Sequence, residues 1–304
     1  MLATVSQRLL QFKRIAAFTD LGGDSGKILR YAASLARWYD SELLLVHAFP
    51  PEFYAPILPG PLAGWPGDNL APRREAEKKM KSLVDELNLH DLAPKAMIRQ
   101  ESVDDILREL EDYHPGLLVM ASHGREGMRK LVAGSVAEEV FRKVQWPVLV
   151  LGPNCQHLEE APQRYFERIL YATDLSGVSV TALQYAATIA HDHEAQLTSL
   201  YVEADPTQGF TFDQVMARQR LQDWLQDHID GLSETLVGVD CFVDFGKPQM
   251  KIVEAATQWH ADLVVLGARG LGAASGPASH FVGGTAYEVI RTSKCPVLIV
   301  PQPR

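Results

Sequence analysis

Short apolar runs alternate along this chain with longer segments in which apolar residues recur every three or four positions. The short runs are rich in branched residues, as expected of strands buried on both faces. They predict strands near residues 14–18, 42–49, 95–99, 116–121 and 147–151. The longer segments predict helices near residues 25–39, 72–88, 102–113 and 135–144. Strands that alternate with helices imply a parallel, doubly wound α/β sheet with right-handed crossovers.

The second half of the chain repeats the pattern of the first half. The repeated segments include a strand followed by Thr-Asp-Leu, an apolar run that leads into a glycine, and a final apolar run after proline. The pairs are FKRIAAFTDL (12–21) with FERILYATDL (166–175), GLLVMASHG (116–124) with DLVVLGARG (262–270), and PVLVL (147–151) with PVLIV (296–300). Repetition over such a length indicates duplication of a whole domain.

We therefore predict two tandem domains, over residues 1–151 (copy one) and 166–304 (copy two), with a polar linker over 152–165. The final run of each copy would leave an exposed strand edge, so we expect the two runs to pair with each other within one chain. Copy one also carries a Pro/Gly-rich loop at 50–72. A lid, a partner surface and a disordered excursion remain open for this loop, as do a homodimer and unknown protein partners.

Composition excludes several classes of protein. The chain has 46% apolar and 22% charged residues, which is typical of a soluble globular protein. Its net charge of −9 and the lack of a Lys/Arg-rich run argue against nucleic acid as a partner. No signal peptide and no apolar run near the ~20 residues of a membrane span are visible, so we expect a cytoplasmic protein. The three scattered cysteines predict reduced thiols, with Cys295 either reactive or simply buried.

Candidate chemistry lies at the carboxyl ends of the strands, where doubly wound sheets bind ligands. Asp20 ends the first strand, and a loop with Gly124 and Gly134 follows the fourth. Backbone N–H groups of such a loop and of a following helix can bind phosphate. His123 and Arg125 add titratable and cationic groups.

Two structural alternatives stand beside this interpretation. The loop can be an ordinary strand-to-helix turn in which Ser135 caps the next helix instead of binding phosphate. Asp20 can likewise cap the helix at 25–39.

With these residues in place, the chain resembles a tandem universal stress protein over nearly its whole length. The motif of the nucleotide-binding members, Gly-x2-Gly-x9-Gly-(Ser/Thr), corresponds here to Ala121, Gly124, Gly134 and Ser135 in copy one, and to Gly267, Gly270, Gly284 and Thr285 in copy two. The resemblance implies two Rossmann-like domains of the adenine nucleotide alpha hydrolase-like fold. Each would have a five-stranded parallel sheet of order 3-2-1-4-5.

The resemblance also implies a ligand, namely ATP with or without Mg²⁺. Adenine contacts would come from Asp20 and the backbone near Val46, and from Asp174 and Val202 in copy two. Phosphate and ribose contacts would come from the loop that begins at Ala121 and reaches Val136.

Both copies depart from the motif. Ala121 replaces the first glycine of copy one, and if the backbone there needs a positive φ, alanine costs about 1 kcal/mol. In copy two, thirteen residues separate Gly270 from Gly284, where nine separate Gly124 from Gly134. We favour copy one because its loop has the motif's length and more cationic residues.

Two functions remain open. One is a nucleotide-binding stress-response or signalling module with at most slow ATP hydrolysis, and the other is a nucleotide-free interaction module. No catalytic residue and no metal site are predicted.

Overall fold

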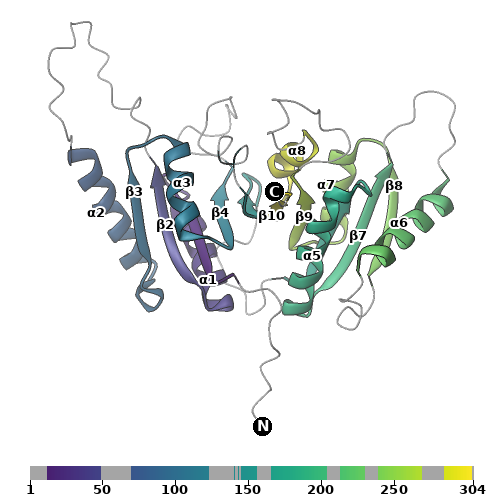
Figure 1. The fold of residues 1–304 in the computed structure, drawn as a ribbon, viewed down its shortest axis with the longest axis horizontal. Helices are drawn as coiled ribbons and strands as arrows, with labels where there is room; N and C mark the ends of the chain where they lie inside the picture. The colour runs from purple at the N-terminus through teal and green to yellow at the C-terminus, as the bar shows by residue number, and fades with distance from the viewer. Residues whose placement is uncertain are drawn as a thin grey trace, which may run out of the picture. The chain divides into compact units, whose positions relative to one another are not determined.

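The computed structural model describes residues 12–48, 70–122, 140, 143, 145–155, 166–203, 213–229, 239–268 and 284–302. The chain divides into two compact units (Figure 1): the first unit runs from Phe12 to Lys143, and the second unit contains Val144 to Arg304. Within the described ranges, no helix combines the length and the apolar character that crossing a membrane requires.

The first unit is a parallel sheet with the strand order β3-β2-β1-β4. Its elements in chain order are β1 (Arg14–Phe18), α1 (Ser25–Tyr39), β2 (Glu42–Ala48), α2 (Leu70–Glu86), β3 (Lys95–Arg99), α3 (Val103–Tyr113) and β4 (Leu117–Ala121). Every apolar residue of β1 is buried, as the continuous apolar run predicts for a central parallel strand. The helix expected over 135–144 lies outside the described residues, apart from Val140 and Lys143.

The second unit has the strand order β5-β10-β9-β6-β7-β8. Its elements are β5 (Val148–Leu151), β6 (Arg168–Thr173), α5 (Val180–His193), β7 (Gln196–Glu203), α6 (Gln214–His228), β8 (Asp240–Phe245), α7 (Pro248–Gln258), β9 (Leu263–Gly267), α8 (Gly284–Thr292) and β10 (Val297–Val300). In this unit α6 packs against β7 and β8, and α7 packs against β7 and α8 (Figure 1). The order 3-2-1-4-5 predicted for copy two is confirmed by β8-β7-β6-β9-β10.

The last strands of the two copies pair, which confirms that prediction. β5 runs antiparallel to β10, with Leu149 opposite Leu298 and Val150 opposite Val297. All four residues of β5 are buried. The second unit is therefore a mixed sheet, in which the last strand of copy one covers the edge that β10 would expose.

Each copy fixes the start of its first strand in its own way. In copy two, the Asp262 Oδ2 atom accepts hydrogen bonds from the backbone N–H groups of Glu167 and Arg168, both at 2.9 Å. Gly116 replaces this aspartate in copy one and lets Phe12 approach closely, since a Cβ atom at 116 would lie 3.2 Å from the Phe12 Cα atom. The same junction is thus held by a carboxylate in one copy and by close packing in the other.

Candidate functional site

Asp20 lies at the carboxyl end of β1, in a turn that its own side chain organises. Its Oδ1 atom accepts hydrogen bonds from the Gly22 amide at 2.8 Å and from the Ser25 hydroxyl at 3.0 Å. Leu21 between them has φ 56°, in the left-handed region that costs about 1–2 kcal/mol for a residue with a Cβ atom. The Thr19 hydroxyl accepts the Leu21 amide at 3.1 Å and supports this strained turn.

The position of Asp20 depends on a glycine two residues later. A Cβ atom at Gly22 would lie 2.9 Å from Oδ2 and 3.0 Å from Oδ1 of Asp20, closer than side chains tolerate. The N-cap residue of α1 is Asp24, so Asp20 does not occupy the capping position. The turn instead holds the Asp20 carboxylate at the edge of the sheet.

Copy two repeats this turn with different donors. The Asp174 Oδ1 atom accepts hydrogen bonds from the Ser176 amide at 3.1 Å, the Ser176 hydroxyl at 2.5 Å and the Ser179 hydroxyl at 2.8 Å. Leu175 has φ 61°, and its amide bonds to the Thr173 hydroxyl at 3.0 Å. A strained conformation that recurs at equivalent positions of both copies indicates that it serves to position the aspartate.

The end of β2 contacts the same turn through the backbone. The Val46 carbonyl accepts the Thr19 amide at 2.9 Å, and the Val46 side chain is fully buried. The next residue, His47, is also buried, and its Nδ1 atom lies 2.8 Å from the Thr19 carbonyl oxygen. Sequence reasoning missed His47, although a histidine within the apolar run LLLVHA was the available signal.

The two valines proposed for adenine contacts are not equivalent in the structure. Val46 pairs with Phe18 of β1, whereas the matching pair in copy two is Leu200 with Ala172 of β6. Val202 lies two residues further along β7, where it pairs with Asp244 of β8.

The fourth strand brings a residue to this edge that sequence reasoning missed. Ala121 is the last residue of β4 and is not among the residues with positive φ, so the conditional cost of alanine does not arise. The next residue, Ser122, is 3% exposed, and its hydroxyl has no hydrogen-bond partner in the described part of the chain. β4 pairs with β1, so Ser122 and Asp20 leave the sheet on neighbouring strands.

In copy two the corresponding strand end carries Gly267 as the last residue of β9, paired with Val300. Ala268 takes the position of Ser122 and has no hydroxyl. Gly284 and Thr285 begin α8, at the helix N-terminus where the motif requires them. His123, Gly124, Arg125, Gly134, Ser135, Val136 and Gly270 lie outside the described residues, as do loop residues 50–69 and linker residues 156–165.

The cysteines are not suited to nucleophilic chemistry. All three are free thiols, and burial raises the pKa of Cys295 to about 11 and that of Cys155 to about 12. A thiol with such a pKa is almost entirely protonated near neutral pH. Of the two alternatives for Cys295, the structure supports the buried, inert residue.

The fold and the repeated edge together define a class: tandem, doubly wound α/β proteins with an aspartate after the first strand and a small residue after the fourth. The Universal stress protein family profile matches residues 11–152 and 166–301. The chain therefore belongs to the universal stress protein family, and it contains two such domains.

Individual relatives agree with this assignment. A universal stress protein of Synechocystis is 30% identical over 153 residues, which are 44% of this chain and 97% of the relative. One of Mycobacterium tuberculosis H37Rv is 26% identical over 198 residues, which are 61% of this chain and 62% of the relative. The crystal structure of a universal stress protein from Archaeoglobus fulgidus covers 96% of this chain and 97% of its own, with a TM-score of 0.68 and 21% identity.

Proposed function

We propose that this universal stress protein binds an adenine nucleotide, ATP or ADP, at the carboxyl edge of copy one. It acts in the cytoplasm in stress response or signalling, with at most slow hydrolysis of the nucleotide. The observation that carries this proposal is that two polar groups leave the sheet on neighbouring strands. One is the Asp20 carboxylate, which is oriented by two hydrogen bonds, and the other is the Ser122 hydroxyl, which is buried and has no partner among the described residues.

Asp20 suits the recognition of a donor on the ligand. Its Oδ1 atom is fixed by Gly22 and Ser25, whereas its Oδ2 atom accepts no hydrogen bond from the described residues. A carboxylate that is already oriented loses little freedom when it accepts another hydrogen bond. An amino or hydroxyl group of a nucleoside is a donor of the required kind.

Ser122 supplies a polar group that a ligand can satisfy. A buried hydroxyl without a partner costs about 1–3 kcal/mol, so a free protein that retains one is destabilised at that point. A phosphate or ribose oxygen of the nucleotide would accept a hydrogen bond from this hydroxyl. The residues at this edge therefore fit the ligand that the family motif implies.

Copy one is the better candidate of the two copies. In copy two, Oδ1 of Asp174 already accepts three hydrogen bonds, two of them from hydroxyls. Ala268 also lacks the hydroxyl that Ser122 provides in copy one.

The test uses two adjacent glycines as a matched pair. Gly22→Ala displaces the Asp20 carboxylate, whereas a Cβ atom at Gly23 meets nothing within 4 Å. We expect the Kd for MgATP, measured by calorimetry, to rise about tenfold or more in Gly22→Ala and to stay unchanged in Gly23→Ala, because a lost charge-assisted hydrogen bond is worth about 1.5–3 kcal/mol. Nucleotide released from the denatured proteins is quantified alongside.

Three results would redirect the proposal. Equal affinity in both glycine variants contradicts a site at Asp20. A loss of binding seen only in Asp174→Asn moves the site to copy two. If the purified wild type releases no nucleotide and binds none on addition of MgATP, the nucleotide-free interaction module replaces it.

A further inference from the structure

The amino edge of copy two holds a cavity of about 260 Å³, at the end of the sheet opposite to the strand ends that carry Asp174 and Gly267. Buried Ile169, Leu170 and Thr198 contribute to its lining from β6 and β7. The C-terminal end of α7 closes one side with Trp259, whose ring lies 4.3 Å from that of Phe242 on β8. Phe242 is 42% exposed, so part of its ring is open to a ligand.

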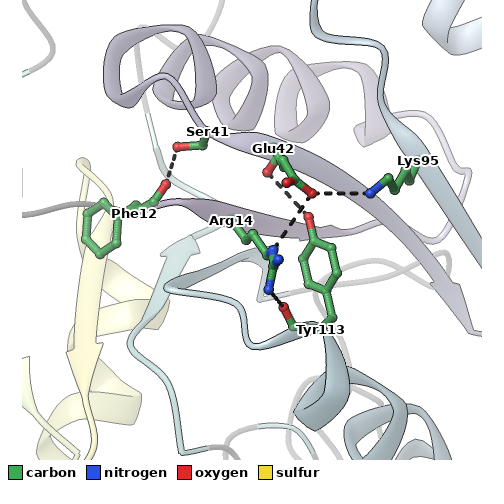
Figure 2. Close-up of polar contacts among 6 residues, drawn as sticks. All are labelled: Phe12, Arg14, Ser41, Glu42, Lys95 and Tyr113. Atoms are coloured by element: carbon green, nitrogen blue, oxygen red, sulfur yellow. Dashed lines mark hydrogen bonds and ion pairs between the residues drawn. The ribbon is translucent and has the colours of Figure 1, made fainter.

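At the same edge of copy one, the charged side chains pair with one another (Figure 2). The Glu42 carboxylate contacts Lys95 at 3.2 Å and Arg14 at 3.8 Å. The Arg14 guanidinium lies 5.3 Å from the centre of the Tyr113 ring and donates a 2.8 Å hydrogen bond to the Tyr113 carbonyl, at the C-terminal end of α3. In copy one the arginine, the carboxylate and the aromatic ring therefore already have interaction partners within the protein.

Copy two changes these groups one by one. The strand register places Gln196 where copy one has Glu42, and Asp240 where it has Lys95. Trp259 takes the place of Tyr113, and each is followed by a histidine in the left-handed region, at φ 51° and 50°. The arginine is kept as Arg168, but the acid beside it has become an amide.

The result is two opposite charges, Arg168 and Asp240, that line the cavity and form no ion pair with the described residues. The Arg168 guanidinium makes no hydrogen bond or ion pair with the described residues, unlike that of Arg14. Asp240 receives one hydrogen bond on Oδ2, from the Gln196 amide at 2.7 Å, and none on Oδ1 from the described residues. The carbonyl groups that end α7 add partial negative charge on the side of Trp259.

From this arrangement we infer that the amino edge of copy two is a second binding site, for a small zwitterion with an aromatic body. Arg168 binds the ligand's carboxylate, Asp240 and the end of α7 bind its ammonium group, and its ring packs on Trp259 and Phe242. The volume lies below the ~300–1,000 Å³ of sites for drug-sized ligands, so a free α-amino acid is the right size. This site does not depend on nucleotide binding at the opposite edge.

The test titrates the full chain with L-phenylalanine by calorimetry, beside two analogues that each lack one charge, phenethylamine and 3-phenylpropionate. We expect one site per chain for L-phenylalanine and at least tenfold weaker binding of each analogue. Arg168→Gln should weaken L-phenylalanine binding at least tenfold, and Arg168→Lys should weaken it less because the charge is kept.

A graft of copy one onto copy two provides the matched control. The triple variant Gln196→Glu, Asp240→Lys, Trp259→Tyr restores the side chains that copy one has at these positions, in which the charges pair with one another. It should abolish binding, while its thermal unfolding curve stays close to that of the wild type. Binding that survives in the graft overturns the inference, as does the absence of binding in a wild type that unfolds cooperatively. Equal affinity for L-phenylalanine and either analogue also overturns it.

Discussion

Gly152, the residue that follows β5, provides a sharp test of how the last strand of copy one is held in the second unit. A Cβ atom added there would lie 2.3 Å from the Ile290 carbonyl oxygen and 3.5 Å from the carbon of that carbonyl. Ile290 lies in the C-terminal half of α8, and the backbone atoms of a helix cannot turn aside as a side chain can. Gly152→Ala therefore requires either the strand or the helix to move.

Neither element has much freedom to move. β5 is fully buried, and Ile290 is 3% exposed. The Asn154 side chain also ties the segment after β5 to α8, by donating a 3.1 Å hydrogen bond to the Arg291 carbonyl. Overpacking of a well-packed region costs about 1–3 kcal/mol. For a unit of this size, each kcal/mol lowers the melting temperature by about 2–4 °C, so we expect a drop of roughly 2–12 °C.

Differential scanning calorimetry of Gly152→Ala measures this drop directly. Gly177→Ala is the matched control, because a Cβ atom at Gly177 in the same unit meets nothing within 4 Å. The control should stay within about 0.5 kcal/mol of the wild type. If Gly152→Ala melts together with Gly177→Ala, then Gly152 does not lie against the backbone of α8 as described.

Two further predictions concern a carboxylate and a thiol. Asp262→Ala should lower the free energy of unfolding by about 1–2 kcal/mol, because the amides of Glu167 and Arg168 lose their acceptor; urea unfolding measures this, and Asp262→Asn, which keeps a carbonyl oxygen, should lose less. Burial raises the pKa of Cys295 from its ordinary value of 9.0 to about 11, so the unfolded chain releases this proton first as the pH rises. The wild type should therefore lose stability relative to Cys295→Ala between pH 9 and about 11, and a constant difference across this range would contradict the burial of the thiol.

The elements and their repetition could be predicted from the amino-acid sequence alone. Alternation of apolar runs with helical periodicity located β1 and β3 to the residue and α1 without error, because a strand buried on both faces and an amphipathic helix each carry a local pattern. The repeated Thr-Asp-Leu marked Asp20 and Asp174 as equivalent strand ends. The exposed edge implied by the final apolar runs was also enough to predict that β5 and β10 pair.

Features that depend on distant neighbours became visible in the folded chain. It placed β5 in the same compact unit as copy two, fixed the Asp20 carboxylate through a left-handed Leu21, and buried the Ser122 hydroxyl. It also revealed that the amino edges of the two copies differ, one satisfied by Arg14 and Glu42 and the other open to a cavity. A local pattern records which residues are apolar, but burial, strain and the pairing of charges arise from residues that are far apart in the chain and meet only after folding.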